Sequence, residues 1–400
     1  MSLRLALDGG DPVRDSMLIF GAPALGEHEY EEVLDTLRSG WIGTGPKSAQ
    51  FELEFAEYIG ARRAVAVSSC TAALHLSLVV SGIGPGDEVV TTPLTFAATA
   101  NVVVHQGATP VFADIDRQTL NIDPMSVRRA LTSRTKAIIP VHFAGLPCDM
   151  EELAQIAEDN NLVIIEDAAH AVGARYRGKQ IGSLGNLTCF SFYANKNLTT
   201  AEGGMVVTED EGQADLISIY RLHGLSGDAW KRFRSKDLLL SDAIYPGFKY
   251  NLTDLQASLG LHQLRKLDGF LAIRERHARR YDSAFEYLTG VRRQPRSARQ
   301  WDRHALHLYV LVLDPEHYSV DRNQIVAALR AENIGAAIHY RALHTHPYYR
   351  ERYGFEPESF PIAAGVGESI FSLPLTPGMS ESDVDDVIAA VRKVLSVYKR

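Results

Sequence analysis

Hydrophobic positions in the first half of the chain form short, nearly continuous runs that alternate with longer amphipathic segments. The runs predict strands at residues 64–68, 87–93, 109–115, 135–143, 161–168, 186–194 and 203–210. The segments between them predict helices at residues 70–82, 96–107 and 150–160. Strands that alternate with helices indicate an α/β fold with a mostly parallel sheet and helices on both faces. The unbroken apolar runs agree with strands that are buried on both sides.

The pattern changes after about Arg274. A charged helix over residues 272–288 precedes a turn-rich segment, a strand at 307–314 and a last helix at 381–399. A chain of 400 residues also exceeds what one hydrophobic core usually holds. We therefore expect a large domain over residues 1–265, with an N-terminal arm over about residues 1–25, and a small C-terminal α+β domain over residues 266–400.

Composition narrows the classes of function. The chain has 41 Lys and Arg against 49 Asp and Glu, a formal charge of −8, which argues against general nucleic-acid binding. Its three cysteines lack disulfide or zinc spacing, which favours a reducing compartment. The N-terminus has no apolar leader, and no apolar run approaches the ~20 residues that cross a membrane. We expect a cytoplasmic protein that binds neither nucleic acid nor a membrane.

Two strand ends carry candidate chemistry. Asp167 directly follows an apolar run, at the sheet edge where α/β proteins bind ligands. A carboxylate there can keep a cationic ring nitrogen protonated, although capping of the next helix explains it equally well. Residues 68–71, "SSCT", lie between a strand and a helix. Free N–H groups at a helix start bind anions, but an ordinary N-cap is the simpler explanation of this segment alone.

Lys196 is the third candidate. It lies in "SFYANKNLTTAEGG", among hydrogen-bonding rather than charged neighbours, unlike a typical surface lysine. Near a buried sheet edge a lysine has a lowered pKa and becomes a nucleophile that forms Schiff bases with carbonyl groups. We interpret Gly203 and Gly204 as allowing a tight backbone turn beside a ligand.

An anion-binding helix start, a strand-end aspartate and a reactive lysine together meet the requirements of pyridoxal phosphate. This cofactor needs a phosphate cradle, a carboxylate on its pyridine nitrogen and a lysine for a Schiff base. Phe96 follows another predicted strand and could stack on the flat ring. Taken alone, its sequence context favours core packing instead.

The sequence resembles the sugar aminotransferases named after DegT, DnrJ, EryC and StrS, which have fold type I among pyridoxal phosphate enzymes. The resemblance runs through nearly the whole chain, in "GWIGTGPK", "SSCTAALHLSL", "GIGPGDEVVTTPLTFAATAN", "TKAIIPVHFAG", "IIEDAAHAVGA", "SFYANKNLTTAEGG", "GFKYNLTDLQASLGLHQL" and "SLPLTPGMSESD". The stretch "IHYRALHTHPYYRERY" resembles the branch that makes 4-amino-4-deoxyarabinose on a nucleotide. Many co-linear motifs carry more weight than any single one.

The resemblance implies a role for each matched residue, with Lys196 and Asp167 as the catalytic pair. Lys196 matches the Schiff-base lysine and Asp167 the partner of the pyridine nitrogen. The implied cofactor contacts are Cys70, Thr71, Phe96, Asp167, His170, Ser191, Lys196 and Asn251. Asn251 matches a residue that reaches the phosphate of the neighbouring subunit, which implies a homodimer with shared active sites. The implied substrate contacts are Trp41, Thr44, Tyr193, His339, Tyr340 and Arg341.

The chain departs from the family pattern at two positions and invites one alternative interpretation. Cys70 and Ala201 stand where glycine is frequent, and the thiol of Cys70 has no evident role. The histidines and tyrosines of residues 339–349 could be interpreted as a metal cluster, but they lack metal-ligand spacing with a carboxylate, so no metal is expected. The resemblance instead places this stretch near a nucleotide diphosphate.

The activity that the resemblance implies is a pyridoxal-phosphate-dependent transamination. The amino group would move from an amino acid, glutamate, to a keto group at C-4 of a nucleotide-linked deoxysugar. The alternatives are amination of a C-3 keto group and amination of a cyclitol ketone. The family's sugar dehydratases carry histidine in place of the lysine, so Lys196 disfavours that activity. The intact lysine, aspartate and phosphate loop disfavour a non-catalytic ligand sensor on the same scaffold.

Overall fold

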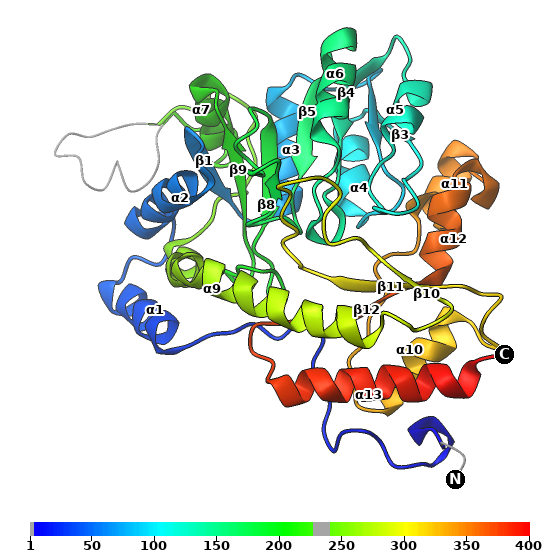
Figure 1. Cartoon of the computed structure of the whole chain (residues 1–400). Helices are drawn as coiled ribbons and strands as arrows, with labels where there is room; N and C mark the ends of the chain where they lie inside the picture. The colour runs from blue at the N-terminus through cyan, green and yellow to red at the C-terminus, as the bar shows by residue number, and fades with distance from the viewer. Residues whose placement is uncertain (1–3, 227–240) are drawn as a thin grey trace.

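A seven-stranded sheet organises the larger part of the molecule (Figure 1). The structure is a computed structural model that describes residues 4–226 and 241–400. The sheet order is β1-β9-β8-β5-β4-β2-β3. Its strands are β1 Arg63–Val67, β2 Glu88–Thr91, β3 Thr109–Phe112, β4 Thr135–Ile139, β5 Val163–Asp167, β8 Leu187–Ser191 and β9 Gly204–Thr208. All seven coincide with the predicted strands, and the predicted mostly parallel α/β sheet is confirmed.

The one reversed strand of this sheet is β9, which pairs antiparallel with both β8 and β1. The other neighbours pair in parallel. Residues 192–203 join β8 to β9 without a helix, and parallel pairing would need a longer crossover connection. As a result, β9 begins at the sheet edge where β5 and β8 end.

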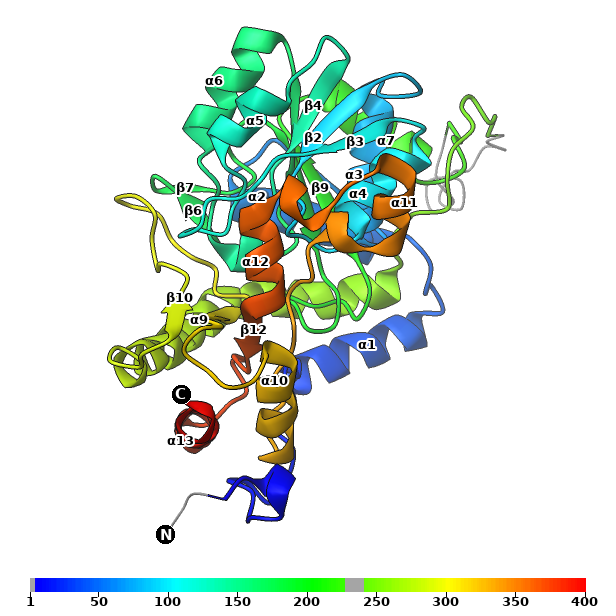
Figure 2. The ribbon, with the colours of Figure 1, turned by 90° about the vertical axis from the view of Figure 1, so that its right-hand side faces the viewer.

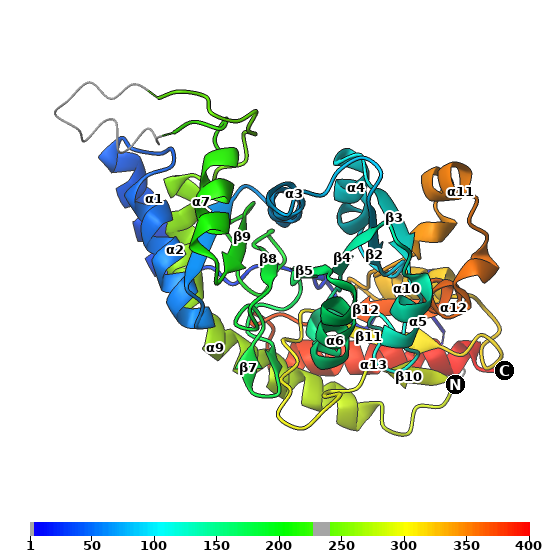
Figure 3. The same cartoon turned by 90° about the horizontal axis from the view of Figure 1, so that it is seen from above.

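Helices cover both faces of the sheet (Figure 3). One face carries α3 Cys70–Val80, α4 Ala98–His105 and α7 Glu211–Tyr220. The other carries α2 Pro46–Ile59, α5 Pro124–Ala130, α6 Met150–Asn160 and the first part of α9 Asp254–Ala284. Helix α1 Glu27–Ser39 lies beside α9, where Gln263 Nε2 donates to Glu29 Oε1 at 2.8 Å.

Local chemistry explains where the helices begin and end, as α6 illustrates. The carboxylate of Asp149 accepts from Glu152 N–H at the first turn, and Asn161 ends the helix in the left-handed conformation with φ 53°. Met150, Leu153 and Ile156 are buried against the sheet at helical spacing. These signals are all short-range, which is why the predicted helix at residues 150–160 agrees with the structure.

The C-terminal part is built on a three-stranded antiparallel sheet in the order β10-β11-β12 (Figure 2). Its elements are β10 Val291–Arg293, β11 Tyr309–Leu313, α10 Arg322–Ala331, α11 Pro347–Tyr353, α12 Pro361–Ser369, β12 Ile370–Leu373 and α13 Glu381–Tyr398. A two-stranded ribbon of β6 Arg175–Tyr176 and β7 Lys179–Gln180 lies outside both sheets.

Helix α9 links the two parts without a break. Its first half packs in the core of the large sheet, and its second half packs with Leu311 and Leu329 in the C-terminal core. The predicted division at residue 265 therefore falls within one helix. The N-terminal arm contacts the C-terminal core, because Leu5 is buried there and Ala6 N–H donates to Glu332 at 2.9 Å. The domain limits stay a prediction. Within the described ranges, no helix has the length and apolarity to cross a membrane.

Candidate active site

A cavity of about 460 Å³ lies at the carboxyl edge of the large sheet. Its walls come from the start of α3, the loop before α4, the ends of β5 and β8, and two segments of the C-terminal part. The predicted site residues that line it are Cys70, Thr71, Phe96, Asp167, His170, Ser191, Tyr193, Lys196, His339 and Tyr340. The tertiary structure therefore brings most of the predicted site into one cavity.

Lys196 lies in the loop between β8 and β9, with its side chain partly buried in this cavity. Its Nζ is 3.4 Å from Nε2 of His307. Burial lowers the pKa of Lys196 to about 8, although the negative charge of Asp167 acts in the opposite direction. A substantial fraction of this amine is thus neutral, and nucleophilic, close to neutral pH.

The lowered pKa gives a direct prediction for the cofactor-free protein. An acylating reagent should modify Lys196 with a midpoint near pH 8, because only the neutral amine reacts. In the urea-unfolded chain the midpoint should rise toward the ordinary lysine value of ~10.4. Competitive labelling followed by mass spectrometry measures both midpoints. Equal midpoints in the folded and unfolded chains would contradict the burial of this amine.

Asp167 ends β5 and is almost completely buried. Its Oδ2 accepts from Thr99 Oγ1 at 2.8 Å and its Oδ1 from Ala169 N–H at 3.1 Å. Burial raises the pKa of this carboxyl, against the effect of both hydrogen bonds. No Lys, Arg or His in the described residues forms an ion pair with it. A protonated ring nitrogen would supply the missing cation, so Asp167 fits the pyridine end of pyridoxal phosphate.

The start of α3 fits the phosphate end of the same cofactor. Ser69 caps the helix by accepting from Ala72 N–H at 3.0 Å, while the N–H groups of Cys70 and Thr71 have no acceptor among the described residues. Unpaired N–H groups and the helix dipole attract an anion. Ser191, at the end of β8, places a hydroxyl in the same cavity.

The glycine pair has a different role from the predicted one. Neither Gly203 nor Gly204 has a positive φ, so neither forms a left-handed turn. A Cβ on Gly204 would lie 2.5 Å from Ser69 C and 2.6 Å from Cys70 N. Gly204 thus lets β9 pass directly against the start of α3. The left-handed residue is Ala201, with φ 66°, which explains why glycine is frequent there and costs this chain roughly 1 kcal/mol.

The Cys70 thiol, which has no evident role in the sequence, lies between β8 and Asp167 in the structure. Its Sγ donates to the carbonyl of Cys189 at 3.4 Å and lies 3.9 Å from Asp167 Oδ1. Burial raises the pKa of this thiol far above its usual value, and the Asp167 charge acts in the same direction. Cys70 therefore stays protonated and serves as packing beside the aspartate.

His170 and Tyr340 form a hydrogen-bonded pair in the wall of the cavity. Nδ1 of His170 accepts from Ala144 N–H at 3.2 Å, and Nε2 lies 3.1 Å from the Tyr340 hydroxyl. Burial lowers the pKa of His170 far below its usual value, so the ring is neutral and its single proton is on Nε2. His170 then donates to Tyr340, and the hydroxyl proton of Tyr340 is left to donate to a ligand.

Two more histidines line the cavity with Lys196, the buried His307 and the half-buried His339, and neither adds charge at neutral pH. Burial, followed by the charge of Lys196, lowers the pKa of His307 far below its usual range and that of His339 to about 4. Both rings are neutral hydrogen-bonding groups. The positive charge in this cavity therefore comes from Lys196 in its protonated form.

Phe96 and Tyr193 expose their rings in the cavity. Phe96 is 63% exposed, so the interpretation as a core residue, favoured by sequence context alone, is wrong. Tyr193 is 48% exposed. Apolar rings that line a cavity instead of the core are available to stack on a planar ligand. That role for Phe96 stays a prediction.

Four predicted residues lie away from this cavity within the single chain. Asn251 Nδ2 donates to Thr44 Oγ1 at 2.6 Å, and both residues line a separate cavity of about 300 Å³. Trp41 Nε1 donates to the Thr44 carbonyl at 3.1 Å. Arg341 is exposed and donates to the side chain and carbonyl of Thr345. Their predicted contacts with cofactor or substrate stay untested.

Two residues of the site are absent from the sequence-based prediction. Thr99 binds Asp167 from the first turn of α4, and His307 contacts Lys196 from the segment before β11. Thr99 follows Phe96 by three residues, so the helical spacing of "FAAT" was a usable signal. His307 is far from Lys196 in the chain, and no local pattern marks it.

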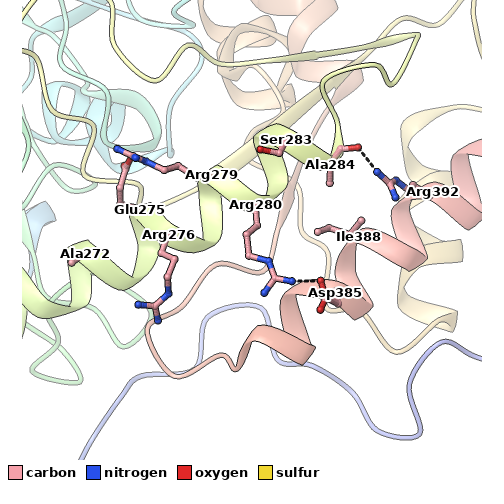
Figure 4. A pocket seen from close by; sticks show the side chains of 10 residues that line it. All are labelled: Ala272, Glu275, Arg276, Arg279, Arg280, Ser283, Ala284, Asp385, Ile388 and Arg392. Atoms are coloured by element: carbon pink, nitrogen blue, oxygen red, sulfur yellow. Dashed lines mark hydrogen bonds and ion pairs between the residues drawn. The ribbon is translucent and has the colours of Figure 1, made fainter.

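A larger cavity, of about 790 Å³, lies between α9 and α13 (Figure 4). Its arginines are partnered: Arg280 pairs with Asp385, and Arg392 donates to the Ala284 carbonyl at 2.8 Å. It contains no candidate nucleophile, so size does not identify the reactive site here. No group of His, Cys, Asp or Glu in the described parts of the chain is arranged to hold a metal ion.

The sequence profile of the DegT/DnrJ/EryC1/StrS aminotransferase family matches residues 23–392. The spore coat polysaccharide biosynthesis protein SpsC of Bacillus subtilis is 50% identical over 383 residues, which cover 96% of this chain and 98% of SpsC.

Solved structures of sugar aminotransferases have the same fold. The putative sugar aminotransferase Spr1654 from Streptococcus pneumoniae, in its PMP-form, superposes with a TM-score of 0.89 at 35% identity, covering 95% of this chain and 99% of that one. PseC of Helicobacter pylori, an aminotransferase involved in pseudoaminic acid biosynthesis, superposes with a TM-score of 0.88 at 28% identity, covering 96% and 100%.

Proposed function

Because the chain belongs to the DegT/DnrJ/EryC1/StrS aminotransferase family, whose members depend on pyridoxal phosphate, we propose that it transfers an amino group from glutamate to the C-4 keto group of a nucleotide-linked deoxysugar. The observation that carries the proposal is the meeting of Lys196, Asp167 and the start of α3 in one cavity. When bound, the cofactor supplies an aldehyde that takes up the amino group and a ring that accepts electrons from the broken C–H bond.

Different residues of the cavity would bind different parts of the cofactor. The N–H groups of Cys70 and Thr71, with the Ser191 hydroxyl, would hold the phosphate. The negative charge of Asp167 would keep the ring nitrogen protonated. The hydrogen bond from Thr99 fixes the orientation of this carboxylate. Lys196 would hold the aldehyde carbon covalently until the donor amino acid replaces it.

Lys196 then serves as the acid and base of the reaction. Its Nζ, freed by the donor, removes the proton from the donor's α-carbon and later returns a proton. A pKa of about 8 suits both roles near neutral pH, because the amine is neither fully protonated nor fully neutral there. His307, at 3.4 Å, offers the amine a neutral hydrogen-bonding partner that adds no competing charge.

The sugar specificity is proposed from two kinds of support. SpsC, at 50% identity, is described as a spore coat polysaccharide biosynthesis protein, and polysaccharides are assembled from activated sugars. His339 and Tyr340, from the stretch that resembles the 4-amino-4-deoxyarabinose branch, line the cavity, and the Tyr340 ring centroid lies 6.1 Å from that of Phe96. The free hydroxyl proton of Tyr340 suits an oxygen-rich substrate.

The reverse reaction tests this proposal. The protein is incubated with 2-oxoglutarate and a panel of aminosugar nucleotides and amino-cyclitols, and glutamate formation is measured. We expect a 4-amino-4-deoxysugar nucleotide to be consumed. Consumption of a 3-amino isomer alone would show that the enzyme aminates C-3 and not C-4. Consumption of an amino-cyclitol alone would contradict a nucleotide-linked substrate.

A homodimer with shared active sites is supported by the surface around α1. Tyr30, Leu34 and Leu37 expose about half of their surface along one stripe of α1. An apolar stripe of this kind is typical of a protein interface. Thr44 and Asn251 line a separate cavity, and we propose that they serve the active site of the other subunit.

Subunit mixing tests the shared site. Lys196→Ala and Asn251→Ala homodimers should each be impaired, but a heterodimer contains one site in which both residues are intact. Random exchange should therefore restore about one quarter of wild-type activity in the mixture. Native mass spectrometry measures the heterodimer fraction. Exchange without recovered activity would show that Asn251 serves its own subunit.

The proposed location of the protein rests on the state of its cysteines. All three cysteines are buried and free. We propose the cytoplasm because free thiols persist under reducing conditions.

A further inference from the structure

A fourth cavity, of about 540 Å³, lies between the C-terminal sheet and α12. Arg292 reaches it from β10 and Arg117 from the segment after β3. One face of α12 closes it, with Ile362, Gly365 and Val366. None of its lining residues is shared with the cavity of Lys196. It is therefore a separate site. It lies where the segment after β3 of the large sheet meets the C-terminal part.

Arg292 is the unusual residue of this cavity. Its Nη1 is buried and has no hydrogen-bond partner, which is costly for a charged group. Burial and the nearby charge of Arg117 lower the pKa of Arg292. Neither arginine forms an ion pair with any described carboxylate. In the cavity between α9 and α13, by contrast, Arg279 and Arg280 are both paired (Figure 4).

The neighbouring acids form no ion pair with the two arginines and accept hydrogen bonds from other groups, although the charge of Asp116 partly offsets that of Arg117 in its effect on the pKa of Arg292. Asp116 Oδ1 accepts three hydrogen bonds within its own turn, from Gln118 and Thr119. Asp114 accepts from the first N–H groups of α12, which leaves that helix start unavailable to a ligand. Asp314 lines the cavity, but its Oδ1 accepts from the backbone of Glu316 at 3.0 Å.

We propose that Arg117 and Arg292 form a binding site for a phosphate group. Two guanidinium groups from different elements match a doubly charged oxyanion, which would pair the buried Nη1 and relieve the repulsion between the two cations. A carboxylate would neutralise one of them. The cavity volume is in the range of small-molecule sites, so the phosphate is either free or attached to an organic group.

Calorimetry on the holoenzyme tests this site. Saturation with pyridoxal phosphate fills the cofactor's own phosphate cradle, and inorganic phosphate and uridine diphosphate are then titrated separately at constant ionic strength. Arg292→Gln and Arg117→Gln should each weaken phosphate binding by roughly 10- to 100-fold, the value of a charge-assisted hydrogen bond. Arg279→Gln, in the other cavity, is the matched control and should bind phosphate as the wild type does.

Each result decides between defined alternatives. A loss of inorganic phosphate binding alone identifies free phosphate as the ligand. A loss of both shows that the site also accepts a phosphate attached to an organic group. Arg117 is exposed, so Arg117→Gln tests the site even where Arg292→Gln destabilises the fold. Phosphate binding that is absent in the wild type, or unchanged in both variants, overturns the proposal.

Discussion

Replacing Lys196 by alanine is expected to lower kcat by at least ~10⁴-fold. The variant loses both the covalent attachment of the cofactor and the base that moves the proton. Lys196 is the only lysine among the described residues that line the cavity, so no other side-chain amine there can replace it. Steady-state transamination with glutamate and the visible absorption of the purified protein measure the two losses separately.

Two variants separate chemistry from charge in this experiment. Lys196→Arg keeps a positive charge in the cavity but is always protonated, so it should be as inactive as Lys196→Ala. Lys179→Ala removes an exposed lysine on β7 and should leave activity unchanged. A Lys196→Ala enzyme that transaminates at near wild-type rate would refute the assigned role.

Replacing Asp167 by asparagine should lower kcat by roughly 10²- to 10⁴-fold. The side chain keeps its shape but loses the negative charge that holds the ring nitrogen protonated. Removing one partner of a buried charge pair costs about 3–5 kcal/mol, which corresponds to this change in rate. Stopped-flow measurement of the half-reaction with glutamate isolates the step that depends on the ring.

The same substitution should have the opposite effect on the stability of the cofactor-free protein. Burial raises the pKa of Asp167, so the ionised carboxylate is less favourable in the folded than in the unfolded chain. That cost is present at pH values above the raised pKa and disappears as the pH falls through it. Cofactor-free Asp167→Asn should therefore unfold at a higher temperature than the wild type at neutral pH. A lower unfolding temperature would mean that the carboxylate is stabilised by a cation in the free protein.

Much of the fold could be predicted because its signals are local. Apolar runs marked all seven strands of the large sheet, and caps such as Asp149 marked helix starts. The carboxyl ends of parallel strands share one edge, so the residues after β5 and β8 had to lie near each other. That is why Asp167 and Lys196 could be paired without the structure.

Other features depend on contacts between distant segments and had no local signal. The exposure of Phe96 in the cavity depends on what packs around its loop. The contact of His307 with Lys196 joins a segment of the C-terminal part to the β8–β9 loop. The glycine pair was correctly singled out, but its partner, the start of α3, became visible only in the fold.

The sequence by itself determined the α/β fold and the family and singled out Lys196 and Asp167 as the candidate reactive pair, because periodicity and motif spacing are properties of neighbouring residues. The tertiary structure alone decided how those residues are charged. Burial sets the lowered pKa of Lys196, the raised pKa of Asp167 and the neutral state of His170. The tertiary structure also placed Arg117 and Arg292 in the lining of one cavity. Burial and charge proximity arise from packing between distant parts of the chain, which a linear pattern does not contain.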